Sequence, residues 1–112
     1  MSDFLCHLDD ISDPGCKGPF TIDGQKIFLY RKGGRVWAWV DSCPHARAPL
    51  EMEADRFLDI TGEYLLCSLH GAHFDPQTGE CVLGPCRGRG LLAYPTIIHN
   101  GKVIRSHPTD RL

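Results

Sequence analysis

Two cysteine–histidine pairs constrain this sequence more than any other feature. Cys43 is followed two residues later by His45, and Cys67 is followed three residues later by His70. Thiolate sulfur and imidazole nitrogen are the side-chain donors that bind zinc and iron–sulfide clusters. Because 21 residues separate the pairs, they can lie on two loops that bind one metal centre from opposite sides. The spacing therefore predicts a metal centre with Cys43, His45, Cys67 and His70 as its ligands.

The rest of the sequence favours short strands joined by turns. Turn-forming pairs recur at 23–24, 33–34, 78–79 and 100–101, among 12 glycines and 8 prolines. Between them lie runs rich in apolar, β-branched or aromatic residues, at 26–30, 36–40, 63–67, 72–74, 80–83, 91–98 and 103–104. We therefore predict an all-β fold with a hairpin across 21–30. Residues 48–57 fit either one or two helical turns or an extended loop.

Length and charge narrow the class of protein. A chain of 112 residues predicts a single domain over 1–112. The formal net charge of -2 gives no basic footprint for nucleic acid, and no apolar run approaches the ~20 residues of a membrane helix. The acidic N-terminal stretch lacks the features of a secretory signal. We therefore expect a cytoplasmic protein whose cysteines stay reduced.

The residues around the two pairs carry a family resemblance. CPHARAPL at 43–50 and CSLHGAHFDPQTGECVLGP at 67–85 resemble the cluster-binding loops of Rieske [2Fe-2S] proteins. The resemblance is close between Trp37 and Tyr94. It implies a Rieske fold of antiparallel sheets with a cluster-binding subdomain at one end, cluster-binding loops at 41–50 and 67–76, and a third loop near 83–87. It also implies one [2Fe-2S] cluster, with both cysteines on the inner iron and both histidines on the outer iron.

Four residues depart from the respiratory members of that family. Those proteins carry a second cysteine in each loop, which form a disulfide, whereas Ala48 and Leu69 occupy the matching positions here. They also place a serine and a tyrosine hydroxyl near the cluster sulfurs, where this sequence has Ala72 and Phe74. Hydrogen bonds to sulfur stabilise the reduced cluster and raise its potential. We therefore expect a centre of low potential and no disulfide beside it.

The resemblance implies a single-electron carrier rather than an enzyme. It points to a stand-alone ferredoxin, like those of bacterial ring-hydroxylating oxygenase systems. Such a protein takes electrons from a flavin-dependent reductase and passes them to a terminal oxygenase or similar acceptor. Two alternatives stay open, namely a redox-sensing or accessory subunit of a larger oxidoreductase and a structural zinc module.

Several other side chains have two interpretations. We interpret His73 as a neighbour of the cluster rather than a rival ligand. Cys81 and Cys86 are either a redox pair or, as we favour, small buried hydrophobic residues. Three arginines follow or lie within the loops and either form a basic rim that attracts an acidic partner or are simply solvated. They are Arg47, Arg87 and Arg89.

Overall fold

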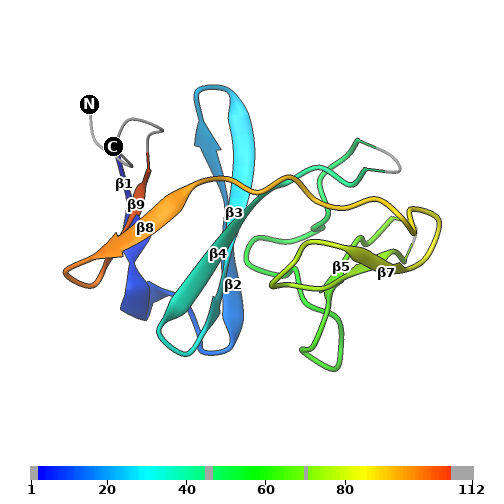
Figure 1. Ribbon diagram of the computed structural model, residues 1–112, viewed down its shortest axis with the longest axis horizontal. Coiled ribbons are helices and arrows are strands. Elements are labelled where there is room, and N and C mark those ends of the chain that lie inside the picture. Colours follow the sequence, from blue (N-terminus) through cyan, green and yellow to red (C-terminus); the bar gives the residue numbers. More distant parts are fainter. Residues whose placement is uncertain (1–2, 45–46, 70, 107–112) are drawn as a thin grey trace.

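The computed structural model of the protein describes residues 3–44, 47–69 and 71–106. These residues form three antiparallel sheets of three strands each, which follow one another along the long axis of the molecule (Figure 1). The first sheet has the order β1 (Phe4–His7), β9 (Lys102–Arg105) and β8 (Thr96–His99). The second has the order β2 (Gly15–Ile22), β3 (Gln25–Lys32) and β4 (Arg35–Val40), and the third β5 (Leu65–Leu66), β6 (His73–Phe74) and β7 (Cys81–Leu83). The all-β prediction is confirmed.

Tight turns join the strands of the second sheet as the sequence predicts. Asp23 and Gly24 connect β2 to β3, and both have positive φ, 51° and 80°. Left-handed backbone at both central positions is typical of a two-residue hairpin, which is why an Asp-Gly pair stands there. A second turn at 33–34 leads from β3 into β4. The predicted hairpin across 21–30 and the predicted turn at 33–34 are therefore present.

Strand β3 is buried on both of its faces. Phe28 and Tyr30 belong to the core that the second sheet shares with the third, whereas Leu29 belongs to the core shared with the first. Successive side chains of a strand point to opposite faces, so the two cores meet at this strand. A strand covered on both sides needs apolar residues throughout, which explains the uninterrupted run at 27–30.

The third sheet rests on the second through aromatic contacts. Phe57 stacks on Phe28 of β3, with ring centroids 4.1 Å apart and ring planes 12° from parallel. The indole of Trp39 in β4 donates a hydrogen bond to the Pro76 carbonyl oxygen over 3.0 Å. These buried contacts hold the third sheet, at the right-hand end of Figure 1, against the longer strands of the second sheet.

Three segments differ from the sequence-based picture. Residues 48–57 form bends and a turn, so the extended alternative holds. The run at 91–98 divides: residues 92–94 bond to β4, where Val40 N–H donates to Leu92 O over 2.8 Å, and only Thr96–His99 forms β8. Strand β1 and the short 3-10 helix η1 (Leu8–Asp10) carried no clear signal. No helix of the described ranges could cross a membrane.

Candidate metal centre

The first predicted loop, 41–50, is closed by its own backbone. Cys43 N–H donates to Ala48 O over 2.8 Å, and Arg47 N–H donates back to Cys43 O over 2.6 Å. Arg47 has a positive φ of 54°, which turns the chain at the fourth position after the cysteine. At the loop's end Leu50 N–H donates to Asp41 Oδ1 over 2.9 Å. The loop is therefore a closed arch that begins and ends beside β4.

The second predicted loop, 67–76, opens with the same arch. Cys67 N–H donates to Ala72 O over 2.8 Å, and Gly71 N–H donates to Cys67 O over 2.9 Å. Gly71 has a φ of 72°, again at the fourth position after the cysteine. A residue with this φ is strained unless it lacks a Cβ, which is why glycine suits the position. The two loops thus present their cysteines on equivalent backbone.

The two arches lie side by side. Ser68 N–H, just after Cys67, donates to Leu50 O at the end of the first loop over 2.9 Å. Cys43 and Cys67 are both fully buried and belong to the same apolar core. The structure therefore brings together the two predicted sulfur ligands, with apolar side chains around them.

The segment in which the resemblance implies a third loop, near 83–87, packs on the second arch. Gly84 has a φ of 108° and lies so close to Ala72 that a Cβ at residue 84 would come within 2.8 Å of the Ala72 Cα. The Arg89 guanidinium donates to Pro44 O over 3.4 Å, which joins the third loop to the first. All three predicted loops therefore meet at the right-hand end of Figure 1.

Two carboxyl groups support the base of the first loop. Asp41 is buried, and neither its Oδ2 nor the Oε1 of half-buried Glu51 has a hydrogen-bond partner among the described atoms. Burial raises the pKa of Asp41 to about 7, and the neighbouring Glu51 carboxyl adds to that increase. The increase has this sign because burial and a nearby like charge both disfavour the ionised form of a carboxyl group. The sequence analysis missed this pair.

His73 is held by partners on both of its ring nitrogens. Its Nδ1 lies 2.8 Å from Gly71 O, and its Nε2 lies 3.5 Å from Asp59 Oδ2. Asp59 in turn accepts hydrogen bonds from the Thr61 hydroxyl over 2.6 Å and Gly62 N–H over 3.0 Å. With both nitrogens engaged, His73 supports the second loop rather than offering a free ligand. The Asp59-Ile60-Thr61-Gly62 run is a turn signal that could have revealed Asp59.

The comparison with known families decides what this arrangement is. Residues 3–106 match the Rieske [2Fe-2S] domain family. This chain belongs to the Rieske [2Fe-2S] family. It is 32% identical to the ferredoxin component of the naphthalene 1,2-dioxygenase/salicylate 5-hydroxylase systems of Ralstonia sp., over 87% of this chain and 86% of that protein.

Solved structures share the fold of this Rieske chain. A ferredoxin of Sphingomonas yanoikuyae B1 superposes with a TM-score of 0.75 at 25% identity, over 96% of this chain and all of that one. The ferredoxin–oxygenase complex of carbazole 1,9a-dioxygenase contains a chain with a TM-score of 0.74 at 24% identity, covering 92% of this chain and 99% of that one. The Rieske fold predicted from the loops is confirmed.

One [2Fe-2S] cluster is the cofactor of a Rieske domain, and the donors that the structure describes fit it. Cys43 and Cys67 supply two buried sulfurs on adjacent loops, which suit iron–sulfide clusters. The other two predicted ligands, His45 and His70, lie outside the described residues. Within those residues no group of three or more metal-binding side chains gathers at one place.

Two buried residues of the second loop carry no hydroxyl group in this Rieske chain. Ala72 and Phe74, at the positions predicted to miss a serine and a tyrosine, are both fully buried. None of the six cysteines, all within the described residues, is in a disulfide. Leu69 is 57% exposed, so the second loop presents an apolar side chain to the surface where other Rieske proteins carry a cysteine.

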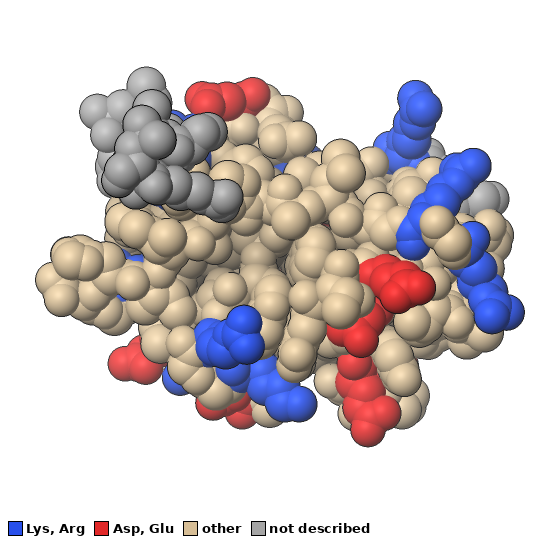
Figure 2. All heavy atoms as spheres, in the orientation of Figure 1, with Lys and Arg blue, Asp and Glu red and all other residues tan. Residues whose placement is uncertain are grey.

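Charge gathers at the loop end of the molecule. Arg47, Arg87 and Arg89 are all exposed, and Figure 2 shows lysine and arginine side chains projecting from the right-hand end, where these loops lie. We call these three residues the arginine rim. Arg47 belongs to the first predicted ligand loop, whereas Arg87 lies in the third loop and Arg89 follows it.

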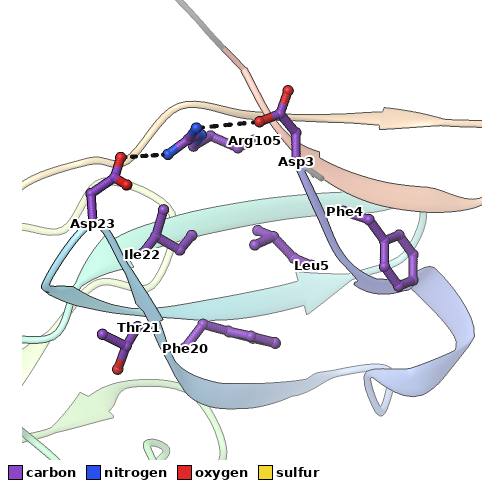
Figure 3. Close-up of a pocket in the computed structure, with 8 residues that line it drawn as sticks. All are labelled: Asp3, Phe4, Leu5, Phe20, Thr21, Ile22, Asp23 and Arg105. Carbon is purple, nitrogen blue, oxygen red and sulfur yellow. Dashed lines mark hydrogen bonds and ion pairs between the residues drawn. The ribbon is translucent and has the colours of Figure 1, made fainter. Parts of the chain in front are cut away.

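The cavity drawn in Figure 3 is separate from these loops. It measures about 310 Å³ and lies between β1 and β2, with apolar walls that include Phe4 and Phe20. Arg105 bridges Asp23 over 2.8 Å and Asp3 over 3.3 Å at its rim. Both acidic groups are therefore engaged with an arginine, and arginine does not bind metals. The cavity offers no donor set for a cluster.

Proposed function

We propose that this Rieske chain carries single electrons on a [2Fe-2S] cluster bound by Cys43, His45, Cys67 and His70. The observation that carries the proposal is the pair of equivalent arches, each opening on a fully buried cysteine, in a chain of this family. When bound, the cluster supplies reversible one-electron redox chemistry. The chain's own residues decide how easily that electron is accepted and where it leaves.

We assign the two cysteines to the iron nearer the core and the two histidines to the other iron. Complete burial of Cys43 and Cys67 supports the first assignment, because their apolar surroundings exclude water from that side. Neutral imidazoles in place of two thiolates make the centre less negative and raise its potential above that of all-cysteine clusters. The missing hydroxyls at Ala72 and Phe74 lower it again, so we infer a low potential within the Rieske range.

The arginine rim supports a role in partner docking. Three exposed arginines on the cluster-binding end attract an acidic face of a redox partner and increase the association rate at low salt. Exposed Leu69 of the second loop and exposed Leu83 of the third loop add apolar contact area. Because the relatives are named as ferredoxin components of dioxygenase systems, we propose a flavin-dependent reductase as donor and a terminal oxygenase as acceptor.

Two further proposals concern organisation and location. We propose that residues 1–112 act as one Rieske domain, which the family match over 3–106 supports. We also propose a cytoplasmic location. The absence of disulfides among the six cysteines, in a structure that describes all of them, fits the reducing cytoplasm.

Rapid mixing of the oxidised protein with candidate NADH-reduced flavin reductases tests the carrier function. We expect reduction in milliseconds to seconds, reoxidation by a terminal oxygenase, and rates that fall with added salt. Arg87→Glu should slow reduction at low salt, whereas Lys102→Glu, exposed on β9 of the first sheet, should leave it unchanged. Reduction that fails with every reductase would contradict the carrier role and favour the redox-sensing alternative. A colourless protein that contains zinc would overturn both.

A further inference from the structure

Two thiols that are not predicted ligands lie in contact where the third loop meets β7. The Cys86 thiol donates to the Cys81 sulfur, with the two Sγ atoms 2.9 Å apart, and both residues are almost completely buried. A disulfide needs about 2.05 Å between its sulfurs, so an approach of about 0.9 Å joins these two. The contact therefore favours the redox-pair interpretation of Cys81 and Cys86 over the purely apolar one.

The backbone brings these two residues together and keeps them there. Cys81 N–H donates to Arg89 O over 2.9 Å, and Arg89 N–H donates to Cys86 O over 2.9 Å. Glu80 and Gly90 form an antiparallel bridge next to these bonds. The chain thus leaves β7 and returns to it within a few residues, so the contact between the two thiols does not depend on a distant segment.

Exposed residues adjoin the thiol pair along the chain. Val82 and Leu83, which follow Cys81, are 40% and 56% exposed, and Arg87, which follows Cys86, is exposed as well. Burial raises the pKa of Cys86 to about 12, and a thiol that keeps its proton reacts slowly with oxidants. The closed loop therefore protects the pair, whereas a local opening of the loop admits a small uncharged oxidant.

From this geometry we propose that Cys81 and Cys86 form a site of reversible oxidation, at which hydrogen peroxide converts the two thiols into a disulfide. One thiol sulfur attacks the peroxide, the O–O bond breaks, and a sulfenic acid and one water molecule form. The other thiol sulfur attacks the sulfenic sulfur, the S–O bond breaks, and the disulfide and a second water molecule form. The two sulfurs lose two electrons to the peroxide, and a dithiol reductant returns them.

The disulfide holds the third loop closed against the second loop. It closes a ring from Cys81 to Cys86, and Gly84 within that ring lies so close to Ala72 that a Cβ there would come within 2.8 Å of the Ala72 Cα. A cross-link restricts the open forms of a loop more than the closed form, so the oxidised protein should lose its cluster more slowly. Only this consequence rests on the proposed function, because the oxidation of the two thiols needs no cluster.

Peptide mapping of the cluster-loaded protein after treatment with hydrogen peroxide tests the site. Cleavage after Glu80 and Arg87 releases residues 81–87, CVLGPCR, which contain Cys81 and Cys86 and no other cysteine. After alkylation in denaturant, we expect this peptide to carry no alkyl group and to be two hydrogen atoms lighter than its reduced form. Dithiothreitol added before alkylation should restore two alkyl groups.

Variants and a rate measurement complete the test. Cys86→Ser should abolish the disulfide, whereas Cys16→Ser, which removes another buried cysteine of the same core, should keep it. The oxidised wild type should lose its visible absorbance in urea about tenfold more slowly than the same protein with free thiols.

The inference is overturned if the wild-type peptide 81–87 still takes two alkyl groups after oxidation, or if Cys86 joins Cys43 or Cys67 instead. Equal bleaching rates after complete disulfide formation would contradict the closing of the third loop. A wild-type protein without any cluster would overturn the proposed function, and the peptide map would still decide whether the two thiols form the disulfide.

Discussion

The two loops that we propose bind the cluster are built on the same backbone from different residues. Each begins with a buried cysteine whose N–H donates to the carbonyl five residues later and whose carbonyl accepts from the N–H four residues later. In the first loop the residue with positive φ is Arg47, and in the second it is Gly71. The histidine follows its cysteine at two residues in one loop and at three in the other. The backbone arch is thus the shared element, whereas the side-chain spacing is not.

The loops also differ in what supports them. The first is closed by the buried Asp41 carboxyl, which accepts from Leu50 N–H. The second runs into β6, where His73 connects it to Asp59. One loop therefore depends on a buried acid and the other on a half-buried ion pair. If the arches are equivalent in function, equivalent substitutions in the two loops should change cluster binding to the same extent. They should change folding stability to different extents, because the supports differ.

The largest expected effect is loss of the cluster when either cysteine is replaced. Cys43→Ala and Cys67→Ala should each abolish cluster binding, because each removes one of only two sulfur ligands. Visible absorbance and iron content per chain measure the result. Cys6→Ala, a buried cysteine in β1, is the control and should keep the cluster. If either cysteine variant kept its full iron content, the two loops would not be equivalent in cluster binding.

The next effect concerns the histidines. His45→Cys and His70→Cys should each lower the potential by on the order of 100 mV or lose the cluster, since a thiolate adds one negative charge to the centre. Redox titration and the EPR spectrum measure the change. His73→Cys should leave the potential close to that of the wild type, because both of its nitrogens bond elsewhere. A large effect at residue 73 with none at residue 70 would reassign the ligand.

A smaller effect separates the two residues with positive φ. Gly71→Ala should destabilise the second loop by about 1 kcal/mol from backbone strain alone, since a Cβ there would have no neighbour within 4 Å. Arg47→Gly should change stability by less than about 0.5 kcal/mol, because relief of strain and lost chain stiffness offset each other. The rate of cluster bleaching in urea should rise about fivefold for Gly71→Ala only. Equal rates for both variants would contradict this difference.

The smallest expected effect is that the stability contributed by Asp59, which supports the second loop through His73, depends on pH. Burial alone would raise the pKa of Asp59, but hydrogen bonds from Thr61, Tyr64 and Gly62 and the charge of His73 outweigh it and lower the pKa overall. A carboxyl group whose pKa is lower in the folded state stabilises the fold at pH values above its unfolded-state pKa, which is about 3.9. That stabilisation is lost as the pH falls through the folded-state pKa.

The substitution Asp59→Asn tests the direction of this pH dependence of stability. The variant should be less stable than the wild type by at most about 1 kcal/mol at pH 7, and the gap should close below about pH 4. Urea unfolding of both proteins across that range provides the measurement. Asp9→Asn is the control, because the Asp9 side chain is 98% exposed. A gap that widens in acid would show that the carboxylate is not what supports the turn.

The site was more predictable from sequence than the arrangement around it. Cys43 and Cys67 stood out because sulfur ligands beside histidines are rare outside metal sites, and the hairpins stood out because Asp-Gly and Gly-Gly pairs encode turns. Local spacing carries both kinds of information. The bounds of the three loops, by contrast, were implied by the resemblance to the Rieske family.

Contacts between distant residues could not be read in this way. Glu51 meets Asp41, Asp59 meets His73, and Asp55 Oδ1 accepts from Gly18 N–H over 2.9 Å. These partners lie on other segments, so no local pattern marks them.

The ligand set is tested most directly by ENDOR spectroscopy of the reduced protein labelled with ¹⁵N at histidine. We predict strong couplings from two inequivalent nitrogens in the wild type, from one in His45→Cys or His70→Cys wherever the cluster is retained, and from two in His73→Cys. Couplings from fewer than two histidines in the wild type, or a reduced protein without an iron–sulfur EPR signal, would contradict the assignment of one sulfur and one nitrogen ligand to each arch.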